Sequence, residues 1–134
     1  MNQAKALQTP NISKLFLPFN QADLASIHSE EENDFVTRLT GGNFCWLGGL
    51  RYEACTGCTS CQNCGFLWSD GTPRDFNKWC SRQPDNYKGD NYKGEDCMSL
   101  NAGKKVGKWG KGEWNDVPCD RTDLGRFVCK KSMN

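Results

Sequence analysis

Oxygen-bearing side chains gather in two polar stretches of the chain. The first begins with Gln83-Pro84-Asp85 and ends with Glu95, and the second is Trp114-Asn115-Asp116. Calcium takes about six to eight oxygen ligands from carboxylates, amides, main-chain carbonyls and water. An X-Pro bond can be cis, and a cis bond before Pro84 would direct the Gln83 and Asp85 side chains to one place. Each residue alone is an ordinary turn former, but together the two stretches predict a calcium site.

Cysteines recur at every third position in CTGCTSCQNC, residues 55–64, and the chain has nine cysteines in total. Ferredoxin clusters use a longer last gap followed by proline, and zinc sites use two separated pairs. We therefore expect disulfides and a secreted protein, in agreement with the N-glycosylation pattern at Asn11. Neighbouring cysteines of the run need a tight backbone to pair, so we expect bridges from some of them to Cys45 and Cys80. The sequence does not choose among the pairings.

The length, charge and composition of the chain exclude several classes of protein. The chain has 134 residues, the size of one domain, and a net charge of +1, which indicates neither nucleic acid nor an anionic membrane as a partner. Its apolar runs are too short to span a bilayer. The first ten residues do not resemble a signal peptide, so we interpret Met1 as an added start codon or the edge of a fragment. His28 is the single histidine, without a nucleophile pattern around it, so we expect a surface histidine and no enzyme.

The elements that must position these residues begin with one helix. Ser29 is a suitable N-cap with Glu32 three residues later, as in a capping box, and Gly41-Gly42 ends the helix. Phe35, Val36 and Leu39 lie at helical spacing and predict the buried face.

Short strands follow the helix, and a polar loop spans residues 72–96. Before the helix, NQAKAL could form one or two helical turns, TPNISKLFLPF is predicted as loop, and residues 22–27 as a short strand. This order predicts an α+β fold with helices packed on small antiparallel sheets. The further predicted strands are FCWLGGL, FLWSDG, DCMSL, GKWGKGEWND and GRFVCKK.

Seven ordered segments resemble the C-type lectin-like domain over residues 22–130. The ordered match is far more specific than any one segment. The resemblance implies a disulfide-rich C-type lectin-like domain over residues 22–131 with a long calcium-binding loop, preceded by an irregular segment, 1–21. The segments are ADLASIHSEEENDFV, CWLGGL, FLWSDGTP, FNKWCSRQPDN, EDCMSL, EWNDVPC and RFVCKK.

The resemblance also implies the site. In sugar-binding members two vicinal hydroxyls bind the calcium and hydrogen-bond to its ligands, and Gln-Pro-Asp accompanies galactose-type diols. We therefore expect a galactose or N-acetylgalactosamine lectin whose partners are glycans with those ends. The implied calcium ligands are Gln83, Asp85, Glu95, Asn115 and Asp116, of which Gln83, Asp85, Glu95 and Asn115 also bind sugar, with Tyr87, Tyr92 and Trp109 as candidate stacking rings.

The chain departs from the family in two places. DNYKG occurs twice, at residues 85–89 and 90–94, and lengthens the loop beside the sugar site. The family's bridge between the central cysteines implies Cys97–Cys119, but its first cysteine is absent, so Cys129 lacks its partner. Either an N-terminal piece is missing, or Cys129 pairs with another chain, or it is free.

Two other functions fit the same resemblance. Some antifreeze proteins share this fold and carry extra disulfides, so ice binding is one alternative. A protein-binding module that has lost sugar binding is the other. We take Trp46, Trp68, Trp79 and Trp114 as core residues, because buried aromatics supply much of a small core.

Overall fold

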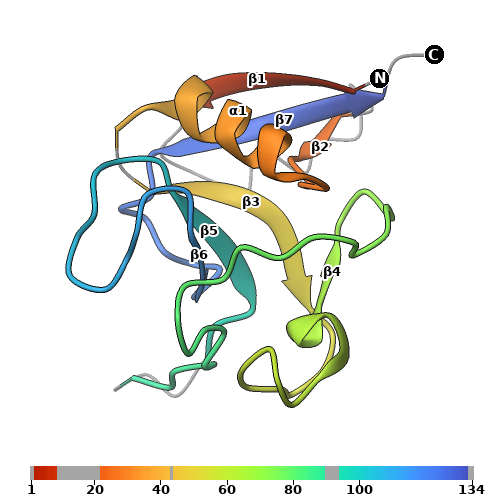
Figure 1. The fold of residues 1–134 in the computed structure, drawn as a ribbon, viewed down its shortest axis with the longest axis vertical. Coiled ribbons are helices and arrows are strands. Elements are labelled where there is room, and N and C mark those ends of the chain that lie inside the picture. Colours follow the sequence, from red (N-terminus) through yellow and green to blue (C-terminus); the bar gives the residue numbers. More distant parts are fainter. Residues whose placement is uncertain (1, 9–21, 43, 90–93, 133–134) are drawn as a thin grey trace.

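The computed structural model describes residues 2–8, 22–42, 44–89 and 94–132, and it confirms the C-type lectin-like α+β architecture. The strands form one sheet in the order β1-β7-β3-β5-β6, with β2 on β7 and β4 on β3 (Figure 1). The elements are β1 (Asn2–Gln8), β2 (Ala22–Leu24), α1 (Glu30–Thr40), β3 (Phe44–Arg51), the 3-10 helix η2 (Gln62–Gly65), β4 (Phe66–Trp68), β5 (Cys97–Asn101), β6 (Trp114–Val117) and β7 (Arg126–Ser132).

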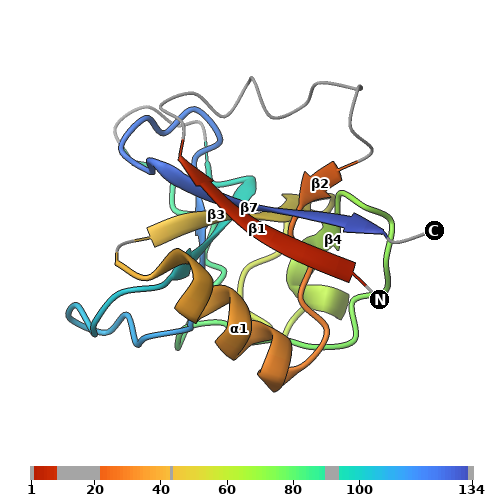
Figure 2. The same cartoon turned by 90° about the horizontal axis from the view of Figure 1, so that it is seen from above.

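The N-terminal residues differ from expectation. NQAKAL was predicted as helical turns within an irregular segment, but it lies in β1, which pairs antiparallel with β7 from Asn2↔Ser132 to Gln8↔Arg126. Isolated helices this short are marginal, whereas pairing along β7 satisfies the main-chain groups. The start of β1 and the end of β7 therefore lie side by side (Figures 1 and 2). The loop TPNISKLFLPF and Asn11 lie outside the described residues.

Helix α1 is capped as predicted but buries a different face. The Ser29 hydroxyl accepts the N–H of Glu32 at 3.1 Å, and the helix ends at Gly41 with φ of 24°. The prediction for Phe35 and Leu39 was wrong, since they are 44% and 37% exposed. The face toward the sheet is more polar because Asn33 accepts the indole N–H of Trp114 at 2.8 Å. Its buried residues are Asn33, Val36, Thr37 and Thr40.

The core lies between this helix face and the sheet. Trp46, Trp68 and Trp114 are buried, as predicted. Trp79 is half-buried and packs edge-on to Trp114, with ring centroids 5.8 Å apart. No helix in the described parts of the chain is long and apolar enough to cross a membrane.

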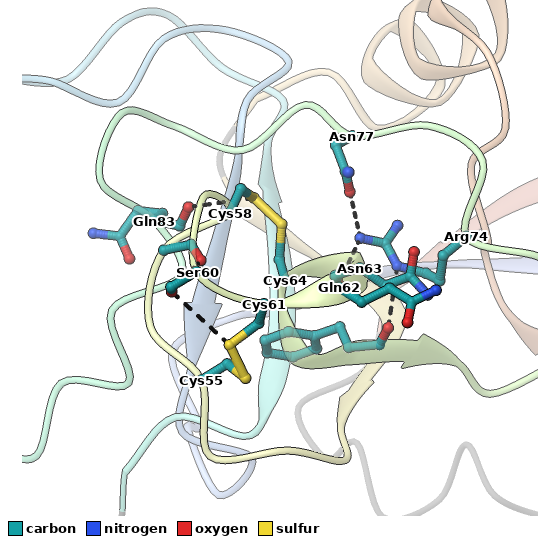
Figure 3. The surroundings of a disulfide bond; sticks show 12 residues. Cys55, Cys58, Ser60, Cys61, Gln62, Asn63, Cys64, Arg74, Asn77 and Gln83 are labelled. Atoms are coloured by element: carbon teal, nitrogen blue, oxygen red, sulfur yellow. Dashed lines mark hydrogen bonds between the residues drawn. A yellow bond between two sulfur atoms is a disulfide. The ribbon is translucent and has the colours of Figure 1, made fainter.

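The cysteine run pairs within itself. The bridges are Cys55–Cys61, Cys58–Cys64 and, as the family resemblance implied, Cys97–Cys119. The expectation of bridges to Cys45 and Cys80 was wrong, because both are buried free thiols; Cys129 is also free. Two non-glycine residues of the run, Asn63 and Cys64, adopt positive φ, and the chain folds back so that cysteines six apart meet (Figure 3).

Candidate metal centre

Three of the predicted ligands come together at one end of the sheet. Oxygens of Asp85, Glu95 and Asp116 all lie within 4.8 Å of one another. Asp116 is on β6, where it pairs with Met98 of β5, and Glu95 stands just before β5. The antiparallel pairing therefore brings Glu95 close to Asp116, and the loop between β4 and β5 adds Asp85. The loop segment that leads into β5 lies at the lower end of the molecule in Figure 1, away from β1 and the end of β7.

Main-chain N–H groups of the loop hold the carboxylates. Asn86 donates to Oδ2 of Asp116 at 2.7 Å, and Asp85 donates to Oδ1 at 3.2 Å. Tyr87 donates to Oε1 of Glu95 at 3.0 Å. The Asn86 side chain accepts the N–H of Glu95 at 2.8 Å, so the loop is closed on itself.

The electrostatics of this cluster favour a bound cation. Burial, together with the charges of Asp116 and Asp85, raises the pKa of Glu95 to about 8. Burial and the charge of Asp85 raise the pKa of Asp116 to about 6, although the Asn86 N–H and Arg51 oppose the rise. Carboxylates that take up protons in this way would release them to a divalent cation.

Of the two predicted amide ligands, Gln83 lies in the same loop as Asp85, and Asn115 lies on β6 before Asp116. The bond between Gln83 and Pro84 is cis, and Gln83 is buried. The Gln83 side chain accepts the N–H of Asp85 at 3.2 Å and donates to its carboxylate at 3.3 Å. The Oδ1 atom of Asn115 is buried without a hydrogen-bond partner. Buried acceptors are almost always paired, so an orphaned amide oxygen on the strand that carries Asp116 fits a missing cation.

The predicted stacking rings are not all at this site. Tyr87 is 67% exposed, and its main chain contacts Glu95. Trp109 lies in the hairpin at the other end of β5 and β6, with the Lys108 ammonium 4.7 Å from its ring centre. The structure therefore does not bring Trp109 together with the carboxylates. Tyr92 lies outside the described residues.

Sequence reasoning missed two contributors to the site. Nη2 of Arg51 lies 2.5 Å from Oδ2 of Asp116. The N–H of Gly57, within the cysteine run, donates to the carbonyl of Pro84 at 2.5 Å. A basic residue at a strand end and a glycine between cysteines are ordinary features, so no sequence pattern linked them to the loop that carries Asp85 and Glu95.

The structure also corrects the prediction for His28, which is half-buried in a second polar cluster. Its Nδ1 lies 2.7 Å from Asp75, and its Nε2 lies 3.0 Å from the hydroxyl of Ser26. These spacings resemble those of a hydrolase triad. However, Ser26 is fully buried and its hydroxyl donates to Asp70 at 2.5 Å, so it is not presented to a substrate.

Comparisons with known proteins agree with this fold. Residues 19–131 match the family model for the lectin C-type domain. The type-2 ice-structuring protein of Osmerus mordax is 39% identical over 112 residues, which cover 82% of this chain and 52% of that protein. A lectin of Pleurodeles waltl is 36% identical over 115 residues, which cover 81% and 55%. The chain thus spans about half the length of these two relatives.

Solved structures show the same fold. The human scavenger receptor C-type lectin carbohydrate-recognition domain has a TM-score of 0.65 at 26% identity, covering 98% of this chain and 92% of that one. A Ca²⁺-dependent type II antifreeze protein in its Ca²⁺-free form has a TM-score of 0.55 at 37% identity, covering 83% and 74%. A calcium-independent type II antifreeze protein also matches, with a TM-score of 0.61 at 25% identity, covering 98% and 83%. From its fold and its match over residues 19–131, the chain belongs to the C-type lectin domain family.

Proposed function

We propose that this chain is a secreted, calcium-dependent carbohydrate-binding protein. The observation that carries the proposal is the convergence of three carboxylates within 4.8 Å of one another. Asn115, which precedes Asp116 on β6, adds a buried Oδ1 without a hydrogen-bond partner. Hard oxygens of this kind suit calcium. The proposed calcium ligands are Gln83, Asp85, Glu95, Asn115 and Asp116.

The open part of the calcium shell would bind the sugar. Five side chains do not fill a shell of about eight positions, so water or two vicinal hydroxyls complete it. Calcium would supply the electrostatic attraction for the hydroxyl oxygens. The ligand carboxylates would accept hydrogen bonds from the hydroxyls, and the amides would donate to them.

We further propose galactose-type specificity. Gln83 and Asp85 place an amide before the proline and a carboxylate after it, which sets the order of donor and acceptor at the two hydroxyls. Tyr87 donates its main-chain N–H to Glu95, and its exposed side chain provides a candidate surface for the apolar face of the sugar. The duplicated DNYKG segment supplies Tyr92 as a second candidate.

The test is retention on immobilised galactose. We expect binding in calcium and release by EDTA, and exchange of Gln83 for Glu with Asp85 for Asn should move preference toward mannose. The exchange conserves the size of both side chains, so a change in sugar preference would not be due to altered packing. Retention that persists in EDTA would exclude the metal-bridged mechanism. If the exchanged variant still prefers galactose, the lengthened loop sets specificity.

Ice binding is the second candidate, and the relatives favour it. The Osmerus mordax protein is named as ice-structuring, and the related type II antifreeze structures include both calcium-dependent and calcium-independent proteins. A thermal-hysteresis measurement with and without calcium separates the candidates. Hysteresis without galactose retention would replace the lectin proposal.

A further inference from the structure

Arg51 is a buried cation at the edge of the carboxylate cluster. Its side chain is 5% exposed, and its guanidinium lies 4.7 Å from the ring centre of Phe66. It donates to the Asp116 carboxylate at 2.5 Å and twice to the Glu95 carbonyl, at 2.9 and 3.1 Å. Nη1 donates to the carbonyl of Cys55 at 2.6 Å. One side chain thus joins two predicted calcium ligands to the disulfide-closed loop.

The charges around Arg51 account for its placement. Asp85, Glu95 and Asp116 bring three negative charges when ionised, and Arg51 brings one positive charge. A calcium ion would supply the remaining two. Without calcium, the buried guanidinium is the cation that directly contacts the carboxylate cluster within the described residues. Asp96, 3.4 Å from Nε of Arg51, is largely exposed and so contributes less.

We propose that Arg51 is a built-in counter-cation that keeps the ligand loop assembled when calcium is absent. It acts as a positioning residue because it fixes the Asp116 carboxylate and the Glu95 carbonyl while the outer part of the cluster stays open. The fork of the guanidinium makes both contacts at once, which a lysine ammonium would not reproduce. The proposal rests on the proposed calcium site.

Arg74 provides a matched control. It is also partly buried against aromatic rings, 4.9 Å from the ring centre of Trp68, and donates to the carbonyls of Asn63, Phe66 and Phe76 (Figure 3 shows Arg74 beside Asn77). It has no hydrogen bond to a predicted calcium ligand. Loss of Arg74 should therefore lower stability without touching the calcium loop.

The first measurement is amide hydrogen exchange by NMR in EDTA. The amides of Asn86 and Tyr87 donate to the Asp116 and Glu95 carboxylates, so their protection reports assembly of the loop. In R51M we expect exchange of both amides to accelerate by about tenfold or more relative to wild type, whereas R74M leaves them within about twofold. R51K keeps the positive charge but lacks the forked guanidinium, so its amide exchange rates should lie between those of R51M and wild type. R51K also replaces R51M as the test variant if R51M does not fold. Unchanged protection in R51M and R51K would overturn the proposal.

The second measurement is the rise in melting temperature on adding calcium. It should be larger in R51M than in wild type, because calcium then replaces the missing positive charge as well as filling its own site. R74M should lower the melting temperature equally with and without calcium. An equal calcium-induced rise in R51M and wild type contradicts the proposal. If wild type shows no rise, the calcium site itself is wrong, while exchange in EDTA still decides the role of Arg51.

Discussion

Among the residues that the structure describes, two acidic clusters differ in how their carboxylates are stabilised. One consists of Asp85, Glu95 and Asp116 with Arg51; the other consists of Asp70, Asp75 and Glu32 around Ser26, His28 and Lys130. In the second cluster Lys130 donates to Glu32 at 2.9 Å and to the Ser26 carbonyl at 2.9 Å. Each of its carboxylates accepts a hydrogen bond from a side chain, that of Ser26, His28 or Lys130. In the first cluster, Glu95 accepts from the main-chain N–H of Tyr87 instead.

The pKa values of the carboxylates also differ between the two clusters. Burial would raise the pKa of Asp70, but hydrogen bonds from Ser26 and Thr72 and the charge of Lys130 outweigh it, so the pKa is lowered. For Glu95 burial and like charges act together, and its pKa rises to about 8. Hydrogen bonds and Lys130 thus keep the pKa of Asp70 low, whereas burial and neighbouring carboxylates raise the pKa of Glu95, an effect that a divalent cation would oppose.

The largest expected effect comes from removing one charge from each cluster. D85N should weaken calcium binding by at least about a hundredfold, because it removes an ionised ligand from the shell. D70N, the matched change in the other cluster, should leave calcium affinity unchanged and lower stability. Isothermal titration with calcium and thermal unfolding measure both. Equal losses of calcium affinity in the two variants would remove the distinction between the clusters.

The second prediction concerns pH. Because the pKa of Glu95 is raised to about 8, calcium must displace a proton below that pH. Affinity should fall about tenfold per unit from pH 8 to 6, and more steeply below the pKa of Asp116, which is about 6. Titration in buffers of different ionisation enthalpy counts the protons released. An affinity that is constant from pH 6 to 8 would contradict this.

The same shift predicts the sign of the stability change without calcium. The folded protein binds more protons at Glu95 than the unfolded chain does between the ordinary glutamate pKa and about 8. Stability of the calcium-free protein should therefore fall as pH rises through that window. Saturating calcium should reduce the fall, since it neutralises the ionised cluster. Denaturant unfolding with EDTA or calcium gives both curves.

The smallest expected effect on calcium binding comes from a change in the second cluster, the one around Ser26 and His28. S26A removes the buried hydroxyl that donates to Asp70, and we expect a loss of about 1–3 kcal/mol in the free energy of unfolding. Calcium affinity should stay at the wild-type value. A change in calcium affinity in S26A would show that the two clusters are coupled.

Local patterns in the sequence predicted much of the scaffold. The cap at Ser29, the stop at Gly41 and the strand FCWLGGL depend on neighbouring residues, and all three were predicted. The prediction that Phe35 and Leu39 are buried was wrong, because helical spacing identifies residues on one face but not which face packs against the sheet. Asn33 faces inward because its amide meets Trp114, which is 81 residues away in the chain.

Residue types and local loop motifs are enough to predict which oxygens could bind calcium, because ligand chemistry is a property of residue type. Tertiary structure alone decided that Asp85, Glu95 and Asp116 converge, that the cysteine run pairs within itself, and that Arg51 enters the carboxylate cluster. Those outcomes depend on strand pairing and on the return of a loop between residues far apart in the chain. Charge balance at a site is a sum over neighbours in space, so it appears only when the chain is folded.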